Sequence, residues 1–220
     1  ECGAQCTGGN YTRWNEVEDL ANIGYPIIEM YENGEFIITK HDGTGGLVNR
    51  QTVSEQILYE MGDPSHYISP DVCVDFTSFD LVDLGENRVK LSNIKGLEAT
   101  PTYKVSISYF AGYKASGQLT ISGPDALKKA ELVAALIWKR LENAGCIYED
   151  KSTEFLGISS CHGDINSIPK QINEVVLRLG VKDNDKDKVN RFGKEIAPVI
   201  TNGPPGVTGF AGGRPKAQEI

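Results

Sequence analysis

The chain has 220 residues, a formal net charge of −8, 40% hydrophobic residues and an excess of glycine, at 24 positions. Its hydrophobic content excludes a wholly disordered chain, because disordered chains lack the apolar side chains that build a core. An acidic surface repels phosphate backbones, so we expect no binding to nucleic acid. No apolar run approaches the roughly 20 residues that span a bilayer, so we expect no membrane partner.

Five cysteines stand at positions 2, 6, 73, 146 and 161. Their number is odd and no CxxC pair occurs, which argues against a disulfide framework and against a structural zinc site. Reduced thiols are typical of the cytosol, so the expected location is cytoplasmic. Asp183, Asp185 and Asp187 have the spacing that starts a calcium loop, but Lys188 and Lys194 stand where such a loop needs Gly and Glu. We therefore expect no metal, and no cofactor is evident.

In chain order, the first hundred residues predict a helix, a hairpin, a second helix and three short strands. The first helix is expected from about Trp14 to Ala21. The strands Pro26–Tyr31 and Phe36–Thr39 flank Asn33-Gly34, a dipeptide typical of a tight hairpin turn. The further elements are a helix at Gln51–Met61, with Thr52–Glu55 as a capping box and Gly62 as its stop, and strands at Asp71–Phe76, Phe79–Leu84 and Arg88–Ser92.

The second half predicts more strands and three helices. Thr102–Tyr109 is the clearest strand, because apolar and polar residues alternate along it, and Tyr113–Ile121 returns after a turn at Gly112. Pro124–Asn143 is the clearest helix, with Pro124 at its first position. The remaining elements are a strand at Thr153–Ile158 and helices at Pro169–Leu179, with Ser167 as cap and Gly180 as stop, and at Asp185–Ala197.

The order of these elements from Thr102 is β-β-α-β-α-α. We therefore predict an α/β or α+β fold, a mixed sheet with helices packed on it in two or three layers, forming one domain over residues 1–220. Residues 203–220 begin with a run of Gly and Pro that bars helix and central strand. We interpret this run as an ordered loop over a site or as the linker into an absent segment.

Glycine-rich turns provide the first two candidate binding sites. In the segment Gln5–Asn10, the amides around Gly8, Gly9 and Asn10 would hold an anion, because glycine lets a ligand approach the backbone closely. The alternative is a turn that simply needs a positive φ.

The second candidate, Lys40–Gly46, joins a hairpin strand to a helix. Lys40 and the amides of Thr44, Gly45 and Gly46 would bind an anion or a phosphate there, as loops entering helix N-termini do. The segment has neither the Walker spacing nor the GxGxxG spacing, so it does not indicate ATP or NAD, and a plain loop is the alternative.

The third candidate is Ser159–Asp164, directly after a predicted strand. His162 is a candidate general acid or base near neutral pH, and Asp164 would orient it. Cys161 is a candidate nucleophile if an ion pair lowers its pKa. The alternative is a hydrogen-bonding turn, which is the commoner role of adjacent polar residues.

Several ordered motifs together resemble the acyclic terpene utilisation core-domain family, the AtuA family. They are spread over essentially the whole chain, at Glu1–Asn10, Ile23–Pro26, Lys40–Gly46, Tyr59–Pro64, Thr100–Val105 and Gly203–Pro215. The resemblance implies that this chain is the second half of a longer core domain, which would explain its start without Met.

The resemblance also implies a role in the catabolism of branched isoprenoid acids, such as citronellol and geraniol derivatives, carried as coenzyme A thioesters. It supplies no catalytic residues. We take His162 and Asp164 as the acid/base pair of a lyase or hydratase acting by hydration or proton transfer, with the glycine-rich turns and Lys40 holding the anionic group.

Two alternatives remain open. One is a non-catalytic scaffold or partner subunit of an acyl-CoA carboxylase system, because no strong catalytic motif occurs. The other is a domain that binds a phosphate or nucleotide ligand. The expected partners are a small-molecule substrate, the rest of the parent chain and a second copy in a homo-oligomer.

Overall fold

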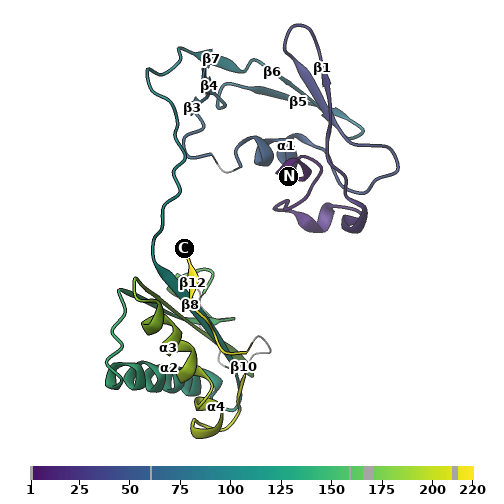
Figure 1. Cartoon of the computed structure of the whole chain (residues 1–220). Coiled ribbons are helices and arrows are strands. Elements are labelled where there is room, and N and C mark those ends of the chain that lie inside the picture. Colours follow the sequence, from purple (N-terminus) through teal and green to yellow (C-terminus); the bar gives the residue numbers. More distant parts are fainter. Residues whose placement is uncertain (1, 60, 159, 166–170, 210–212) are drawn as a thin grey trace. The chain divides into compact units, whose positions relative to one another are not determined.

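A computed structural model describes residues 2–59, 61–158, 160–165, 171–209 and 213–220, with the backbone alone at Cys2 and Asp164. Contacts divide the chain into two compact units, residues 1–106 and 107–220, and each is described by itself (Figure 1). The sequence favours one domain because no linker composition marks this boundary. The predicted mixture of helices and sheets is confirmed.

The first unit is built from short elements and two antiparallel sheets. A four-stranded sheet has the order β1-β2-β6-β5 and a three-stranded sheet has the order β3-β4-β7. The elements are η1 (Cys2–Gln5), η2 (Trp14–Glu16), η3 (Leu20–Asn22), β1 (Ile27–Met30), β2 (Phe36–Thr39), α1 (Arg50–Ile57), β3 (Tyr67–Ile68), β4 (Cys73–Asp75), β5 (Asp80–Gly85), β6 (Arg88–Ser92) and β7 (Lys95–Leu97). The predicted hairpin is confirmed, with Ile27 opposite Thr39.

The core of the first unit lies between one face of the four-stranded sheet and α1. Val53 of α1 is fully buried, and it belongs to the same apolar cluster as Val89 and Leu91 of the central strand β6. The helix begins one residue earlier than predicted, because the Asn49 side chain accepts the amides of Gln51 and Thr52 while the Thr52 hydroxyl accepts the Asn49 amide. The capping box predicted at Thr52–Glu55 is therefore wrong, and the helix ends at Ile57, before the predicted stop at Gly62.

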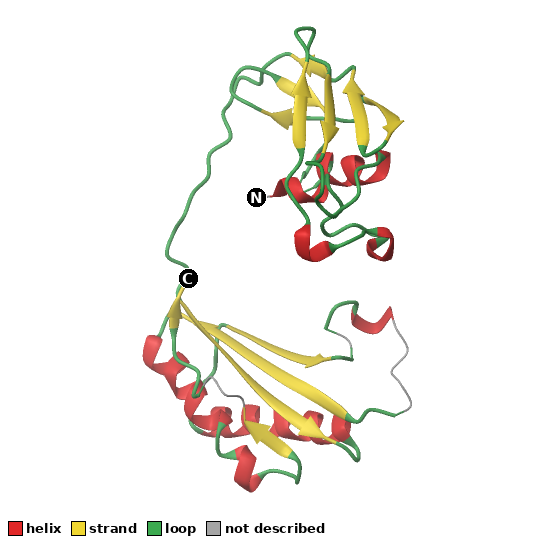
Figure 2. Cartoon of the chain, turned by 90° about the vertical axis from the view of Figure 1, so that its right-hand side faces the viewer, coloured by secondary structure: helices red, strands yellow, loops and turns green. Residues whose placement is uncertain are grey.

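The second unit is a five-stranded antiparallel sheet with helices on one side (Figure 2). Across the sheet, the strand order is β9-β10-β8. On its other side, β8 pairs with β11 at one end and with β12 at the other end. The elements are β8 (Tyr113–Ser122), α2 (Ala126–Asn143), β9 (Asp150–Leu156), η4 (Gly163–Ile165), β10 (Glu174–Asp183), α3 (Lys186–Ile196), α4 (Val199–Asn202), β11 (Val207–Gly209) and β12 (Gln218–Glu219).

Strict alternation along β8 and β10 separates the two faces of this sheet. Leu119 and Ile121 of β8 and Leu177 and Leu179 of β10 are buried under α2 and α3. Trp138 of α2 stacks on the ring of a buried phenylalanine in α3, with the ring centroids 6.2 Å apart. The opposite face carries exposed polar side chains, and no described helix or strand of this unit covers it.

The helix predicted at Pro169–Leu179 is wrong, because residues 174–183 form β10, the central strand of the sheet. Ile172, Val175, Val176 and Leu179 have helical spacing, yet every second residue from Val175 to Val181 is buried, which is the period of a strand. Gly180 therefore lies inside a strand and is not a helix stop. The predicted cap Ser167 lies outside the described residues.

The strand predicted at Thr102–Tyr109 is also wrong, because residues 103–112 have no regular secondary structure. Tyr103, Val105, Ile107 and Tyr109 are between 72% and 79% exposed. An alternating pattern gives a strand only where a neighbouring strand completes the hydrogen bonds, and no described strand pairs with this segment.

Smaller corrections concern element ends. The helix expected over Trp14–Ala21 is two separate 3₁₀ turns. Pro124 follows Gly123 through a cis peptide bond and precedes α2, so it is not the first helical residue. The Gly/Pro run contains the short strand β11. No helix in the described parts of the chain is long and apolar enough to cross a bilayer.

Candidate functional site

Two of the predicted binding turns lie together in the first unit. The amide of Leu47 donates to the carbonyl of Thr7 at 2.8 Å, which joins the turn after Lys40 to the turn at Gly8 and Gly9. The Gly46 amide donates to the Glu18 carbonyl at 2.7 Å. Three backbone segments therefore cross at this point.

The crossing explains why glycine is needed there. A Cβ atom at Gly45 would lie 2.2 Å from the carbonyl oxygen of Asp19, and one at Gly46 would lie 2.4 Å from that of Thr7. Asn10, at the end of the first turn, has a φ of 55° and an exposed side chain.

The amides expected to hold an anion are engaged with the chain itself. Gly8 and Gly9 donate to carbonyls of η1, and Thr44 and Gly45 donate to the carbonyls of His41 and Asn22. Lys40 is folded back on its own loop, where its ammonium donates to the Thr44 carbonyl at 2.5 Å. Anion binding by these residues stays a prediction, and their observed role is to hold the crossing together.

Cys6 and Thr52 complete this part of the first unit. Burial raises the pKa of the Cys6 thiol to about 11, so this cysteine is an inert part of the core. The Thr52 hydroxyl donates to the Cys6 carbonyl at 2.9 Å and thereby ties α1 to the N-terminal turn.

The predicted acid/base pair lies in the second unit, in the connection between β9 and β10. His162 is exposed in the turn before η4, and Asp164 belongs to η4, but its side chain is outside the described part of the chain. Cys161 beside them is exposed. Whether His162 and Asp164 act as a pair stays a prediction.

The aspartates of the rejected calcium loop have structural roles. Asp183 is buried and accepts the Lys188 ammonium and the amides of Glu149 and Asp185. The Asp185 side chain accepts two amides in the first turn of α3 and caps that helix. Among the described residues, no group of three or more metal-ligating side chains is close enough to hold an ion.

The sequence does not predict the largest described cavity of the second unit, a groove of about 800 Å³ along the free side of β8. Between its pairings with β11 and β12, β8 has β10 as its only described strand neighbour. The groove occupies this gap and is closed on its other sides by α3, α4 and residues 213–218. Its lining is Ser116, Gly117, Gln118, Leu119, Gly193, Ile196, Ala197, Ile200, Gly209, Gly213, Arg214, Pro215, Lys216 and Gln218.

Close backbone contacts shape the groove. A Cβ atom at Gly193 would lie 2.0 Å from the carbonyl oxygen of Pro215, so only glycine lets the C-terminal segment lie against α3. A Cβ at Gly117 would lie 3.0 Å from the Pro215 ring. The Ala217 amide donates to the Asn190 side chain at 2.9 Å and fixes the same segment to α3.

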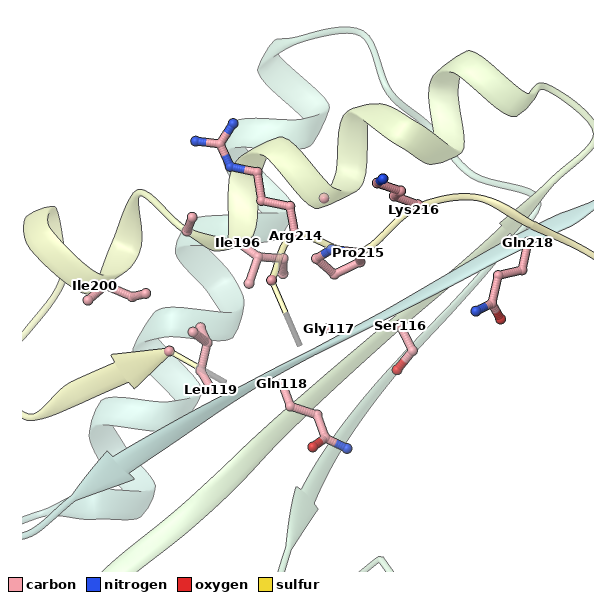
Figure 3. A pocket seen from close by; sticks show the side chains of 14 residues that line it. Ser116, Gly117, Gln118, Leu119, Ile196, Ile200, Arg214, Pro215, Lys216 and Gln218 are labelled. Carbon is pink, nitrogen blue, oxygen red and sulfur yellow. The ribbon is translucent and has the colours of Figure 1, made fainter. Parts of the chain in front are cut away.

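The groove combines an apolar floor with a cationic rim. Leu119, Ile196 and Pro215 lie on one side of β8, whereas the side chains of Ser116 and Gln118 point to the other side (Figure 3). Arg214 and Lys216 are exposed, and neither makes an ion pair or a hydrogen bond within the described ranges. Such a site fits a ligand with an apolar body and an anionic end.

Sequence reasoning misses the groove because its lining comes from four separate segments and contains no motif. The signal that points to it is the Gly/Pro run, interpreted above as a loop over a site or as a linker into an absent segment, and Gly209, Gly213, Arg214 and Pro215 of that run line the groove. The lining contains neither His162 nor Asp164, and it contains no carboxylate or imidazole.

The family model described as acyclic terpene utilisation family protein AtuA matches residues 1–220. No curated protein and no solved structure matches the chain significantly.

Proposed function

Because the chain belongs to the acyclic terpene utilisation family AtuA, we propose that its second unit binds a branched isoprenoid acid, free or as a thioester, in the groove along β8. The observation that carries this proposal is the groove itself, with apolar residues on its floor and two cations at its rim. The family name points to acyclic terpene utilisation, and the apolar floor and cationic rim of the groove support an acid derived from such a compound as the ligand.

The floor of the groove suits the hydrocarbon part of such a ligand. Leu119 and Ile196 are buried, and Ile200 is 39% exposed at the groove wall. Each methylene that leaves water contributes about 0.8 kcal/mol, so a ten-carbon chain in contact with this floor gains several kcal/mol. Gly209 keeps the wall open, since a Cβ there would lie 2.9 Å from the Ile200 side chain.

The rim of the groove suits an anionic group. The guanidinium of Arg214 offers paired N–H donors that match a carboxylate, and Lys216 adds a point charge two residues further along. A charge-assisted hydrogen bond of this kind contributes about 1.5–3 kcal/mol.

The reaction that we propose is hydration or proton transfer at a branched, unsaturated acyl group. In a hydration, a base takes one proton of water while the oxygen bonds to the acyl chain, and an acid returns a proton to the neighbouring carbon. His162 is the one histidine of residues 107–220 and is our candidate for this proton transfer, with Asp164 orienting it. Neither residue lines the groove, so this role requires the acyl group to extend from the groove to the connection between β9 and β10.

A second candidate function is a non-catalytic binding subunit. It is favoured by the lining of the groove, which offers no group that takes up or releases a proton near neutral pH. Turnover of an unsaturated branched acyl thioester by the isolated chain, lost in His162→Gln, supports the catalytic function. Binding without turnover supports the subunit.

Calorimetric titration of the 220-residue chain with geranic acid tests the binding proposal. Decanoic acid, which has as many carbon atoms but no branches, is the matched ligand control. We expect saturable binding of geranic acid, tighter than that of decanoic acid. We expect Arg214→Gln and Lys216→Gln each to weaken this binding at least about tenfold, since each removes one charged contact.

Lys128→Gln is the matched control variant, because Lys128 is a lysine of α2 with an 82% exposed side chain. It should leave the dissociation constant unchanged. Absence of geranic acid binding, or binding that neither Arg214→Gln nor Lys216→Gln weakens, would contradict the proposal.

A further inference from the structure

The uncovered face of the sheet in the second unit contains a hollow centred on Gly180. In the strand register Gly180 lies opposite Ser116 of β8 on one side and opposite Ser152 of β9 on the other. Because the central residue of this row has no side chain, a cavity of about 270 Å³ opens between the neighbouring side chains. The Ser152 hydroxyl reaches over it, 2.6 Å from where a Cβ of Gly180 would be.

Two lysines border this hollow from the next row of the sheet. Lys114 of β8 and Lys182 of β10 are direct cross-strand partners, and both line the cavity. In the parts of the chain that the structure describes, neither ammonium has a carboxylate within 4.0 Å, although Asp150 lies opposite Lys182 on β9 and also lines the cavity. Like charges directly opposite each other destabilise a sheet, so an anion between them would remove a repulsion.

On the other side of the hollow, the neighbouring row of side chains has its positive charge paired, unlike Lys114 and Lys182. There Arg178 of β10 forms a two-armed hydrogen-bonded pair with Glu154 of β9, at 2.6 and 2.9 Å. The positive charge on that row is thus balanced within the sheet, whereas Lys114 and Lys182 form no such ion pair with any described carboxylate.

We propose that this hollow binds a phosphate group. Lys114, Lys182, Ser116 and Ser152 all line the hollow and offer ammonium and hydroxyl donors. They come from three strands, and a tetrahedral anion presents its acceptor oxygens in more directions than a flat carboxylate does. The Gln218 side chain lines the same hollow and adds an amide donor. Ser116 and Gln218 point to this face of the sheet, away from Pro215 and the groove floor (Figure 3).

This inference stands independently of the proposed function, although the two sites are neighbours. Ser116 and Gln218 contribute to the lining of both cavities, the groove through the free side of β8 and the hollow through its uncovered face. A phosphate in the hollow therefore lies next to whatever occupies the groove. The phosphate comes either from the free ion or from a phosphate ester.

Amide chemical shifts of the ¹⁵N-labelled 220-residue chain test the proposal, in titrations with inorganic phosphate and with methyl phosphate at constant ionic strength. We expect saturable shifts at Ser116, Gly180 and Ser152. Lys114→Gln and Lys182→Gln should each weaken binding at least fivefold, and Lys128→Gln should not. Both anions carry a tetrahedral phosphate group, so binding of either one supports the site. Tighter binding of inorganic phosphate would indicate the free ion as the natural ligand, and tighter binding of methyl phosphate would indicate a phosphate ester.

Gly180→Ala is a further variant that keeps both lysines. Its methyl group projects into the centre of the hollow next to the Ser152 hydroxyl, and rotation of that hydroxyl relieves the contact, so the sheet should form while phosphate binding is weakened at least fivefold. The proposal is overturned if the shifts do not saturate, or if neither lysine variant changes them. Arg214→Gln should leave phosphate binding intact, because Arg214 lines the groove and not the hollow. This variant therefore distinguishes a failure of the phosphate proposal from a failure of the proposed acid binding in the groove.

Discussion

Both units of the molecule are rich in glycine, but the glycines have a different structural role in each unit. In the first unit Gly45 and Gly46 allow three backbone segments to cross, and the amides at the crossing donate to carbonyls of the chain. In the second unit Gly193 and Gly117 bring the C-terminal segment close to α3 and β8 and leave a groove beside it. Clustered glycines thus mark close backbone approach, and only the surrounding topology decides whether a cavity results.

Gly45→Ala should have the largest effect and tests the crossing in the first unit. The new methyl group would lie 2.2 Å from one backbone oxygen and 2.7 Å from another, neither of which moves without displacing the turn. We expect the free energy of unfolding of the first unit to fall by more than about 3 kcal/mol, measured by urea denaturation.

Gly43→Ala is the matched control for that variant. Gly43 lies in the same loop with a φ of 74°, but nothing lies within 4 Å of its Cβ position. Only the strain of a positive φ remains, so we expect a loss of about 1 kcal/mol. Equal losses in the two variants would show that the crossing does not depend on close contact.

Gly193→Ala should have the next largest effect and tests the groove. The methyl group would collide with the Pro215 carbonyl and push the C-terminal segment off α3. We expect a loss of about 1–3 kcal/mol in the stability of the second unit. Faster hydrogen exchange at Ala217, whose amide bonds to Asn190, would locate the damage.

The control for the groove is Gly213→Ala, in the same segment. Its φ is 76° and its Cβ position is open, so the C-terminal segment should stay docked. If Gly193→Ala leaves the exchange of Ala217 unchanged, the groove does not depend on this contact.

Asp183→Asn tests the electrostatics of the second unit and should cost about 1–2 kcal/mol at neutral pH. Burial raises the pKa of the Asp183 carboxyl, but the Lys188 ammonium and the amides of Asp185 and Glu149 outweigh burial and hold it below the ordinary value of 3.8. A depressed pKa contributes stability above pH 4, and this contribution is lost as the pH falls through the folded-state pKa.

The stability difference between wild type and Asp183→Asn should therefore shrink as the pH is lowered below 4, as measured by thermal unfolding across that range. A difference that stays constant from pH 7 to pH 2 would contradict the assignment. Asp187→Asn, at an exposed position in the first turn of α3, is the matched control.

Lys114→Gln should have the smallest effect on stability, and it should raise stability where the other variants lower it. Removing one of two lysines that face each other across β8 and β10 relieves their repulsion, so the chain without phosphate should gain about 0.2–1 kcal/mol. Thermal unfolding in phosphate-free buffer measures this gain. A loss of stability in that buffer would mean that the pair is not repulsive.

Much of the fold follows from local patterns in the sequence. Asn33-Gly34 predicts the first hairpin, and the start and end of α3 follow from Asp185 and Pro198. The central strand β10 is missed because Val176 interrupts its alternation and creates helical spacing. The strand expected at Thr102–Tyr109 fails because a strand depends on a partner, which no local pattern supplies.

The groove along β8 and the hollow at Gly180 cannot be predicted from local sequence patterns. The groove depends on where β11 and β12 stop pairing with β8, a property of the assembled sheet. The hollow at Gly180 depends on strand register, which places serines from two other strands beside it. Neither long-range pairing is encoded in a short motif.

The position of the two tryptophans makes the units separately observable. Trp138 is packed against the Phe192 ring in the second unit, whereas Trp14 in the first unit is 68% exposed. An exposed indole emits at longer wavelength than a packed one, so the Trp14→Phe chain reports by fluorescence on the second unit alone. Each unit thus carries its own optical label, and the unfolding of one can be followed while the other stays folded.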